Sequence, residues 1–427
     1  MLDNLKVIKH QAGEKVIDHR LSFWLLTKTR KANNTMVYQQ KSNLYQAVLD
    51  LITEEGTNGF KEVLKLLMNA AMVEEREKYL GAASYERTED RLGYANGFKL
   101  KTINTRVGSL GLEIPQTRDC KFYPQSLEKG KRSERALGLA IVEMYVQGVS
   151  TRNVEAITKQ LCGFEISSST VSKLVAELDP LLKEWRERPL NKYKYVYLDA
   201  RYEKVRHGGL VVDQAVFTAA GVNDDGRREM LGTSVSLSEA EVHWREFLGQ
   251  LQKRGLHGVQ LFISDDHSGL KAARKAVFPG IPWQRCQVHL QRNAQTYVPK
   301  EAMKGQVAAD IRAIFNAPDR AEADRLLKKT MTTYEKSAPK LSSWLEENIA
   351  EGLTIFSFPA QHRTKIRTTN MIERLNREIK RRTQVVSIFP NENSCLRLVT
   401  AVVMEMSEEW LTERQRYMPA LKETDTG

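Results

Sequence analysis

Three acidic residues lie where a carboxylate can take part in chemistry. Asp199 ends the strand-like run Tyr-Lys-Tyr-Val-Tyr-Leu-Asp, and Asp265 ends the run Val-Gln-Leu-Phe-Ile-Ser-Asp. Glu373 lies in a basic, helix-like segment. An apolar strand that ends in a carboxylate places the charge at a sheet edge, where the functional groups of α/β folds collect. Two such strands and an acid from a basic helix predict a carboxylate cluster that holds divalent metal next to a polyanion.

Simpler explanations exist for each acid. A single aspartate at a strand end usually starts a turn. Glu373 has Arg377 four residues later, so a solvated ion pair on the helix surface explains it equally well. Clustered carboxylates stay ionised only beside metal or basic partners. Two strands that each end in aspartate, together with a third acid, favour the carboxylate cluster over two separate turns. Asp266 is a possible spare ligand, but the alternation of side chains along a strand points it to the face opposite that of Asp265.

The helix around Glu373 leaves one choice open. Its apolar face consists of Met371, Ile372, Leu375 and Ile379. Glu373 lies roughly opposite this face, and Glu378 lies nearer its flank. The two glutamates cannot both face one site, and helical spacing alone does not select between them.

The elements that position these acids alternate between strands and helices. Period-two patterns predict five strands, at 193–199, 210–222, 228–236, 259–265 and 283–289. One helix lies between the third and fourth strands, and another follows the fourth. This order predicts a mixed sheet of the α/β class. Residues 291 to about 360 have helical spacing throughout and separate the second acid from the third, as an insertion would.

The part of the chain before the sheet is mostly helical. Residues 42–80 have helical spacing, and the Gly- and Arg-rich segment up to residue 119 contains short alternating strands. That segment either follows a DNA backbone or is a solvated β-hairpin. Farther on, Ser150 caps a predicted helix over 151–161, Gly163 lies in the break, and a serine caps the next helix.

Two helices separated by a short turn with glycine form either a helix-turn-helix or an ordinary helical hairpin. In the helix-turn-helix interpretation, polar residues of the second helix point toward a major groove. These residues are Ser169, Thr170, Ser172 and Lys173.

Composition narrows the class of partner. The 427 residues include 65 Lys and Arg against 53 Asp and Glu, a net charge of +12. This excess favours a phosphate-rich partner over a generic basic protein. The four cysteines are far apart and lack zinc spacing, which is typical of a reduced intracellular protein. No apolar run approaches the roughly 18 residues of a membrane span, so we expect a cytoplasmic, nucleoid-associated protein.

Several sequence blocks occur in one order along the chain. They are Leu198-Asp199-Ala200-Arg201-Tyr202-Glu203-Lys204-Val205-Arg206, Asp225-Gly226-Arg227-Arg228-Glu229, Ile263-Ser264-Asp265-Asp266-His267-Ser268-Gly269-Leu270, Trp283-Gln284-Arg285-Cys286-Gln287-Val288-His289 and Thr368-Thr369-Asn370-Met371-Ile372-Glu373-Arg374-Leu375-Asn376. With these blocks the chain resembles bacterial insertion-sequence transposases of the Mutator-like superfamily, from about Met36 to Met418.

The resemblance implies a ribonuclease H-like α/β catalytic domain with a helical insertion. It implies that Asp199, Asp265 and Glu373 form the catalytic and metal-binding triad of a DDE transposase, and it favours Glu373 over Glu378. Two Mg²⁺ ions, which Mn²⁺ can replace, are the expected cofactor. The Cys286-x-x-His289 pair belongs to the superfamily's signature; we place both residues near the site but not as metal ligands, with His289 on the scissile phosphate.

Basic residues and His289 near the three acids are predicted DNA contacts in addition to those of the helix-turn-helix. They are Lys204, Arg206, Arg285, His289, Arg374, Arg377, Lys380, Arg381 and Arg382. Trp283 either stacks on a base at a distorted DNA end or fills the core, and the core is the role we expect.

The predicted organisation follows from these patterns. It comprises a basic N-terminal extension (1–35), a helical N-terminal region (36–82), a Gly/Arg-rich β segment (83–125), a helix-turn-helix region (130–188), the first part of the ribonuclease H-like core (191–290), a helical insertion (291–362), the core's catalytic helix (363–390) and a C-terminal helix (391–427).

The predicted reaction is cleavage at the terminal inverted repeats of an insertion sequence, followed by strand transfer into double-stranded target DNA. Because two ends must be paired, we expect a homodimer or larger assembly. Two other classes stay open. A non-catalytic DNA-binding regulator would bind DNA without cleaving it, and a sugar hydrolase with paired carboxylates would stay active in EDTA.

Overall fold

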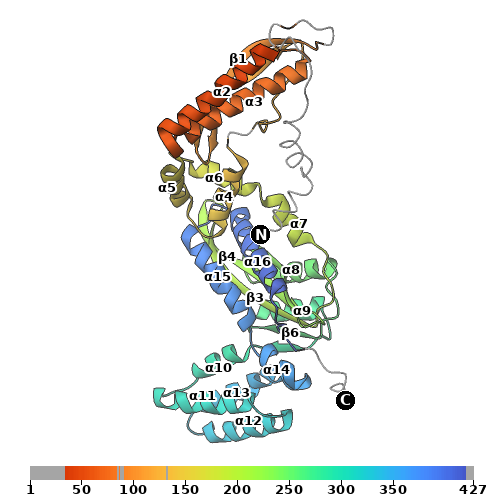
Figure 1. Cartoon of the computed structure of the whole chain (residues 1–427). Helices are drawn as coiled ribbons and strands as arrows, with labels where there is room; N and C mark the ends of the chain where they lie inside the picture. The colour runs from red at the N-terminus through yellow and green to blue at the C-terminus, as the bar shows by residue number, and fades with distance from the viewer. Residues whose placement is uncertain (1–33, 84–85, 87–90, 131–132, 420–427) are drawn as a thin grey trace. The chain divides into compact units, whose positions relative to one another are not determined.

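The computed structural model describes residues 34–419, apart from 84–85, 87–90 and 131–132. Most of the predicted N-terminal extension (1–35) therefore lies outside the described residues. The chain divides into two compact units, with the boundary between Val175 and Ala176. Each unit is described by itself below (Figure 1).

The first unit begins with two helices and a two-stranded sheet. Helix α2 (Asn34–Glu55) is followed by α3 (Phe60–Leu80), and strands β1 (Tyr94–Thr105) and β2 (Gly108–Arg118) pair antiparallel. Helix α3 contributes Met72 to a small core formed mainly by alternate residues of the two strands. These residues face inward because side chains alternate between the faces of a strand.

Three short helices complete the first unit. They are α4 (Arg135–Val146), α5 (Thr151–Cys162) and α6 (Ser168–Ala176). As expected, the Ser150 side chain caps α5 by accepting a hydrogen bond from the Asn153 amide. Gly163 ends α5 with a φ of 72°, a left-handed conformation that glycine adopts without steric cost. Ile141, Val154, Val171 and neighbouring apolar residues form the core between the helices.

The second unit begins with helix α7 (Asp179–Glu187) and is built on a five-stranded sheet. Its strands are β3 (Tyr195–His207), β4 (Leu210–Val222), β5 (Arg228–Ser236), β6 (Leu261–Ser264) and β7 (Trp283–Arg285), in the order β5-β4-β3-β6-β7. The first three pair antiparallel, and β6 and β7 add in parallel. The sheet is therefore mixed, as predicted.

Strands β3, β6 and β7 differ in their bounds from the prediction; β6 is shorter by two residues at its start and one at its end, and the other two differ more at their ends. Strand β3 continues eight residues beyond Asp199 because β4 pairs with it along its whole length. Strand β7 ends at Arg285, and residues 287–289, predicted as strand, open helix α10 (Gln287–Gln295). The Cys286 amide still donates to the Ser264 carbonyl of β6, but the Gln287 amide donates to the Arg367 carbonyl, outside the sheet. Pairing with β6 therefore stops before Gln287, which makes the strand shorter than predicted.

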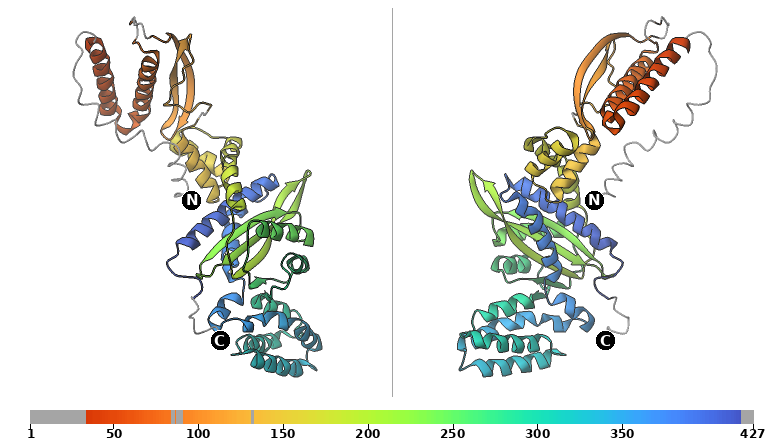
Figure 2. Two further views of the ribbon diagram at one scale, coloured as in Figure 1. Left: turned by 90° about the vertical axis from the view of Figure 1, so that its right-hand side faces the viewer. Right: turned by 60° about the vertical axis from the view of Figure 1, so that its left-hand side comes forward.

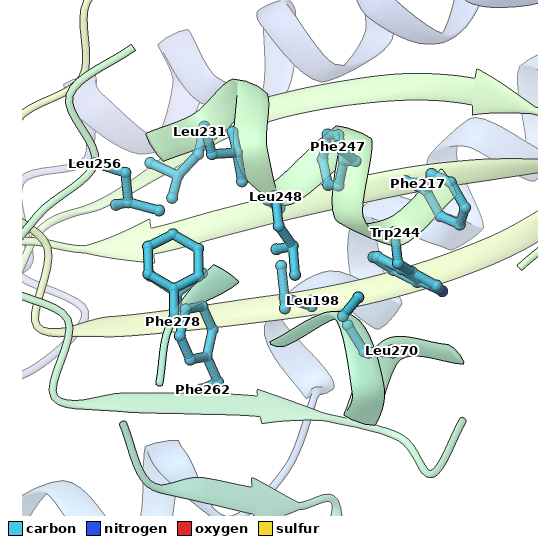
Figure 3. Packing of buried hydrophobic residues seen from close by; sticks show 14 of the residues in the cluster. Leu198, Phe217, Leu231, Trp244, Phe247, Leu248, Leu256, Phe262, Leu270 and Phe278 are labelled. Carbon is cyan, nitrogen blue, oxygen red and sulfur yellow. The ribbon is translucent and has the colours of Figure 1, made fainter. Parts of the chain in front are cut away.

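One face of the sheet packs against helices α8 (Glu241–Lys253) and α9 (Ser268–Val277). Figure 3 shows Phe217 and Leu198 of the sheet meeting Trp244 and Leu248 of α8. The rings of Phe217 and Trp244 lie 4.1 Å apart between centroids. Burial of aromatic side chains of this size is a main source of stability in such a layer, so it anchors the strand that carries Asp199.

The opposite face is covered by helices α15 (Asn370–Val386) and α16 (Glu392–Thr412), drawn in blue in Figure 2. The apolar stripe predicted for α15 is buried. Odd-numbered residues of β3 point to this side and form hydrogen bonds with α14 (Ala360–Ile366) and then α15. Tyr195 bonds to His362, Tyr197 to the Lys365 carbonyl, Asp199 to Asn376, Arg201 to the Asn376 carbonyl, and Glu203 to Thr383.

A helical segment interrupts the chain between β7 and α15. Helices α10, α11 (Glu301–Phe315), α12 (Arg320–Tyr334) and α13 (Pro339–Asn348) enclose their own apolar core, and α14 (Ala360–Ile366) leads back. The two ends of the segment are joined by side-chain amides of Gln284 and Gln287, which both donate to the Gly352 carbonyl at 2.8 Å. Gly352 packs so closely that an added Cβ would lie 2.5 Å from Leu290. None of the described helices has the length and apolar character required to cross a membrane.

Candidate active site

Asp199 and Asp265 lie side by side, with Asp265 directly after the end of β6 and Asp199 inside the longer, parallel strand β3. The register of β3 and β6 pairs Tyr195 with Leu261 and Tyr197 with Ile263, so two residues later Asp199 is level with Asp265. Adjacent strands are ~4.8 Å apart. Burial raises the pKa of Asp199 to about 7, and the nearby charge of Asp265 adds to this effect. The two aspartates predicted from separate strands therefore meet at one edge of the sheet.

Helix α15 brings Glu373 to the same side. The Thr369 hydroxyl at its N-terminus contacts the Cys286 sulfur at 3.5 Å, and the Asn376 amide donates to Asp199. Glu373 lies four residues after Thr369 and three before Asn376, so all three share one face of the helix. Glu373 therefore lies on the helix face that carries both contacts, and it is half-buried there.

Glu378 faces elsewhere on the same helix. It accepts hydrogen bonds from Arg381 at 2.6 Å and from Arg382 at 2.9 Å. The bond from Arg381 is the main reason that the pKa of Glu378 falls to about 2, with Arg382 adding to the effect. Glu378 is thus committed to ion pairs within the fold, which supports the choice of Glu373.

Cys286 and His289 lie directly against Asp265. His289 Nδ1 is 2.5 Å from Asp265 Oδ1, and the possible ligand atoms of the three residues lie within 4.8 Å of one another. The hydrogen bond to Asp265 is the main reason that the pKa of His289 rises to about 10. Burial raises the pKa of the Cys286 thiol, but hydrogen bonds with His289 and Thr369 outweigh it and leave the pKa below its usual value. His289 therefore contacts Asp265, and Cys286 contacts His289. The C-x-x-H spacing alone did not reveal the contact with Asp265.

The oxygen ligands at this edge suit a hard divalent cation. Carboxylates are the side chains that Mg²⁺ and Mn²⁺ prefer. The Asp199 carboxylate has a neutral side-chain partner and an elevated pKa, so its negative charge lacks compensation that a cation would supply. Asp199, Asp265 and Glu373 therefore fit such an ion, whereas Asp266 is turned away and paired with Lys271 at 2.6 Å.

Comparison with known proteins identifies the family. A family model described as "Transposase, Mutator family" matches residues 36–413. The chain belongs to the Mutator family of transposases. A transposase for insertion sequence element IS406 of Burkholderia multivorans is 53% identical over 379 residues, which cover 88% of this chain and 98% of that protein. The transposase for ISRM5 of Rhizobium meliloti is 45% identical, covering 87% and 93%.

More distant proteins extend the comparison. The transposase for IS256 in transposon Tn4001 of Staphylococcus aureus is 36% identical over 88% of this chain and 97% of its own length. Among solved structures, a simian T-cell lymphotropic virus intasome in complex with a PP2A regulatory subunit aligns at a TM-score of 0.17, with 10% identity, over 47% of this chain and 67% of that chain. That score is too low to indicate a shared fold.

Two arginines predicted to contact DNA are buried in this Mutator-family transposase. Arg285 is 2% exposed and pairs with Asp266 at 2.9 Å and Glu351 at 3.0 Å. Arg382 is 4% exposed and pairs with Glu378 and Glu405. Both guanidinium groups are thus used inside the protein, and the structure contradicts a phosphate contact for either.

The other predicted DNA contacts of the transposase are at the surface, with His289 excepted because it faces Asp265. On α15, Arg374, Arg377, Lys380 and Arg381 are exposed, although Arg381 pairs with Glu378. The outer half of β3 exposes Lys204 and Arg206. In the first unit α6 exposes Ser169, Thr170, Ser172 and Lys173.

Some contacts of the transposase site escaped the sequence analysis. Asn376 and Thr369 stand in the block around Glu373, but neither was assigned a role. The available signal was their helical spacing from Glu373, which places them on its face. Trp283 is half-buried, with its indole nitrogen donating to Ser264 and Lys271 over its ring, so it packs against the protein as expected.

Proposed function

We propose that this transposase is a DDE enzyme that binds the terminal inverted repeats of its insertion sequence and catalyses metal-dependent DNA cleavage and strand transfer. The observation that carries the proposal is the meeting of Asp199 and Asp265 on neighbouring strands, with Glu373 on the helix face that contacts the same edge. Three antiparallel strands followed by two parallel ones, with helices on both faces, support a ribonuclease H-like domain.

The three carboxylates would hold divalent cations, with Mg²⁺ the expected ion and Mn²⁺ a substitute. Bound there, such cations polarise a phosphodiester and lower the pKa of an attacking water. The protein's own part is to hold the acids in place. The Asn376 amide donates to Asp199, His289 lies against Asp265, and the Thr369–Cys286 contact lies at the start of the helix that carries Glu373.

Exposed basic residues on α15 support a DNA path beside the site. Arg374 and Arg377 flank Glu373 on the helix surface and would bind phosphates as ion-pair partners. In the first unit, α5 and α6 with Gly163 between them support a helix-turn-helix in which α6 contacts bases. Hydrolysis at the element's ends leaves 3′-hydroxyl groups, which then attack target DNA. Because the ends must be paired, at least two copies of the chain act together.

Cleavage of DNA carrying the element's own ends tests this function. We expect nicking and strand transfer by the purified protein in Mg²⁺ or Mn²⁺, and none in EDTA. Asp199→Asn, Asp265→Asn and Glu373→Gln should each abolish both reactions, whereas Glu378→Gln on the same helix should retain them. DNA binding without cleavage would instead identify a regulator, and activity in EDTA would exclude the metal-dependent reaction.

A further inference from the structure

Asn376 is a residue outside the three acids that contacts one of them, Asp199, directly. Its side-chain Nδ2 donates to Asp199 Oδ2, and its backbone carbonyl accepts from Arg201 Nη1 at 2.6 Å. Arg201 is two residues after Asp199 on the same face of β3. Asn376 is therefore held at two points by the strand whose carboxylate it contacts.

The contacts next to Asn376 fix the position of its helix. Arg201 forms an ion pair with Glu203 at 2.7 Å, and Glu203 accepts from the Thr383 hydroxyl at 3.0 Å. Successive residues of β3 on one face thus contact α15 at Asn376 and, two helical turns later, at Thr383. Asn376 thus has a defined rotation and height above Asp199, as a residue that orients a carboxylate requires.

Within the described part of the chain, the Asp199 carboxylate accepts from the Asn376 side chain and from the backbone amide of its neighbour Ala200, so Asn376 is its partner from another element. A carboxylate turns freely about its last torsion unless a partner holds it, because that torsion has broad minima. The amide nitrogen must face Asp199, since the amide oxygen would be repelled by a carboxylate. Asn376 Oδ1 is buried and has no hydrogen-bond partner.

We propose that Asn376 is a positioning residue that orients Asp199 for cation binding; this inference rests on the proposed function. The amide acts by donating its proton to Asp199 and does not itself bind the ion. Removing a hydrogen-bond partner of a metal ligand typically weakens metal affinity or activity by about 10–100-fold. The loss appears as a higher metal requirement, which a residue needed only for folding would not produce.

Two variants separate orientation from direct coordination. Asn376→Ala removes the donor, and Asn376→Asp keeps the shape and the oxygen atoms while replacing the donor with an acceptor. The orienting role predicts that both variants bind Mn²⁺ more weakly, by about 10–100-fold. A direct ligand role predicts that Asn376→Asp binds Mn²⁺ as tightly as the unaltered protein or more tightly. Gln384→Ala, an exposed amide two turns later on α15, is the matched control.

The experiment measures Mn²⁺ affinity of the full-length chain by calorimetry and the Mn²⁺ concentration that half-saturates cleavage of DNA with the element's ends. We expect both values to rise in the two Asn376 variants, with cleavage partly restored at high Mn²⁺ and melting temperatures near that of Gln384→Ala. Values within twofold of the control, or tighter binding by Asn376→Asp, would overturn the inference. Because Asn376→Asp is isosteric, it keeps the test open if Asn376→Ala does not fold.

The proposed function and this inference fail in distinguishable ways. If the unaltered protein does not bind Mn²⁺, or if Asp199→Ala cleaves normally, the proposed function fails. If Asp199→Ala abolishes cleavage while the Asn376 variants behave as the control does, only the assignment of Asn376 is wrong.

Discussion

The two aspartates at the sheet edge are held in different ways. Asp199 is partly buried and has a neutral amide, Asn376, as its side-chain partner, so burial drives its pKa to about 7. Asp265 lies against His289, a side chain that can carry the opposite charge. Without a cation, the first acid is therefore destabilised as an anion, and the second is compensated within the protein. A bound cation would therefore stabilise Asp199 more than Asp265.

The largest expected effect is the loss of DNA cleavage in both aspartate variants. Asp199→Asn and Asp265→Asn should each lower the cleavage rate by at least roughly 10³-fold, since removal of single members of a catalytic group has effects of this size or larger. Single-turnover cleavage in Mn²⁺ measures it. If one variant kept more than a tenth of the rate, the two acids would not belong to one site.

The next effect is on the free energy of unfolding, which should rise in Asp199→Asn and fall in Asp265→Asn. The pKa of Asp199 is about 7 when folded and 3.8 when unfolded, so between these values the native state binds more protons. The metal-free protein therefore loses stability as pH rises from about 4 to about 7. Asp199→Asn has no carboxyl group to titrate at this position. Its free energy of unfolding should therefore exceed that of the unaltered protein by an amount that grows across this pH range to at most ~4 kcal/mol. Urea unfolding in EDTA measures it, and Mg²⁺ should close the gap.

Asp265→Asn should change stability in the opposite direction. The pKa of His289 rises from 6.5 to about 10 through its contact with Asp265, so this pair stabilises the fold fully below about pH 6.5 and is lost as pH rises through about 10. The variant should therefore be less stable than the unaltered protein at pH 6. Equal stability changes for both aspartate variants would remove the contrast between the two acids.

A smaller effect concerns the surroundings of Asp265. Arg285 joins Asp266, the next residue, to Glu351 at the end of the helical segment, and Lys271 closes the ring by pairing with both acids. Arg285→Met leaves these partly exposed acids with one cation. We expect a loss of about 2–3 kcal/mol, less than the full cost of breaking a buried ion pair. Denaturant unfolding measures it, and Arg320→Met, in an exposed ion pair on α12, is the control.

The smallest effect lies on the surface that neither aspartate contacts. Arg374→Ala and Arg377→Ala should each weaken DNA binding by about 1 kcal/mol and reduce the slope of log affinity against log salt by about one. Binding to DNA with the element's ends at several salt concentrations measures both. Arg382→Met should leave the salt slope unchanged because Arg382 is buried; a change in slope would place this arginine on DNA.

The local patterns of the sequence predicted much of this arrangement. An apolar run ending in aspartate marks where a carboxylate follows a buried stretch of strand, so Asp199 and Asp265 could be selected without knowing the sheet, although β3 continues past Asp199 to His207. Their adjacency depends on the parallel register of β3 and β6, which no local pattern specifies. Asn376 was overlooked for the same reason, because its partner lies 177 residues earlier.

The errors have a common physical origin. Arg285 and Arg382 were assigned to DNA from their charge, and charge alone does not show whether a partner is nucleic acid or protein. Glu351 lies 66 residues from Arg285, and Glu405 lies 23 residues from Arg382. Burial of an arginine depends on such distant acids, so only the folded structure separates these two from the exposed Arg374 and Arg377.

The bonds from Gln284 and Gln287 to the Gly352 carbonyl have a consequence for how the chain can vary. They join the chain at the base of the helical segment, where Arg285 also pairs with Glu351. Extra turns or missing helices beyond this base would alter the count of residues between Asp265 and Glu373 without displacing either carboxylate. The number of residues between these two acids can therefore vary without moving them. A reporter domain inserted into a loop of the helical segment far from its base should leave the site intact.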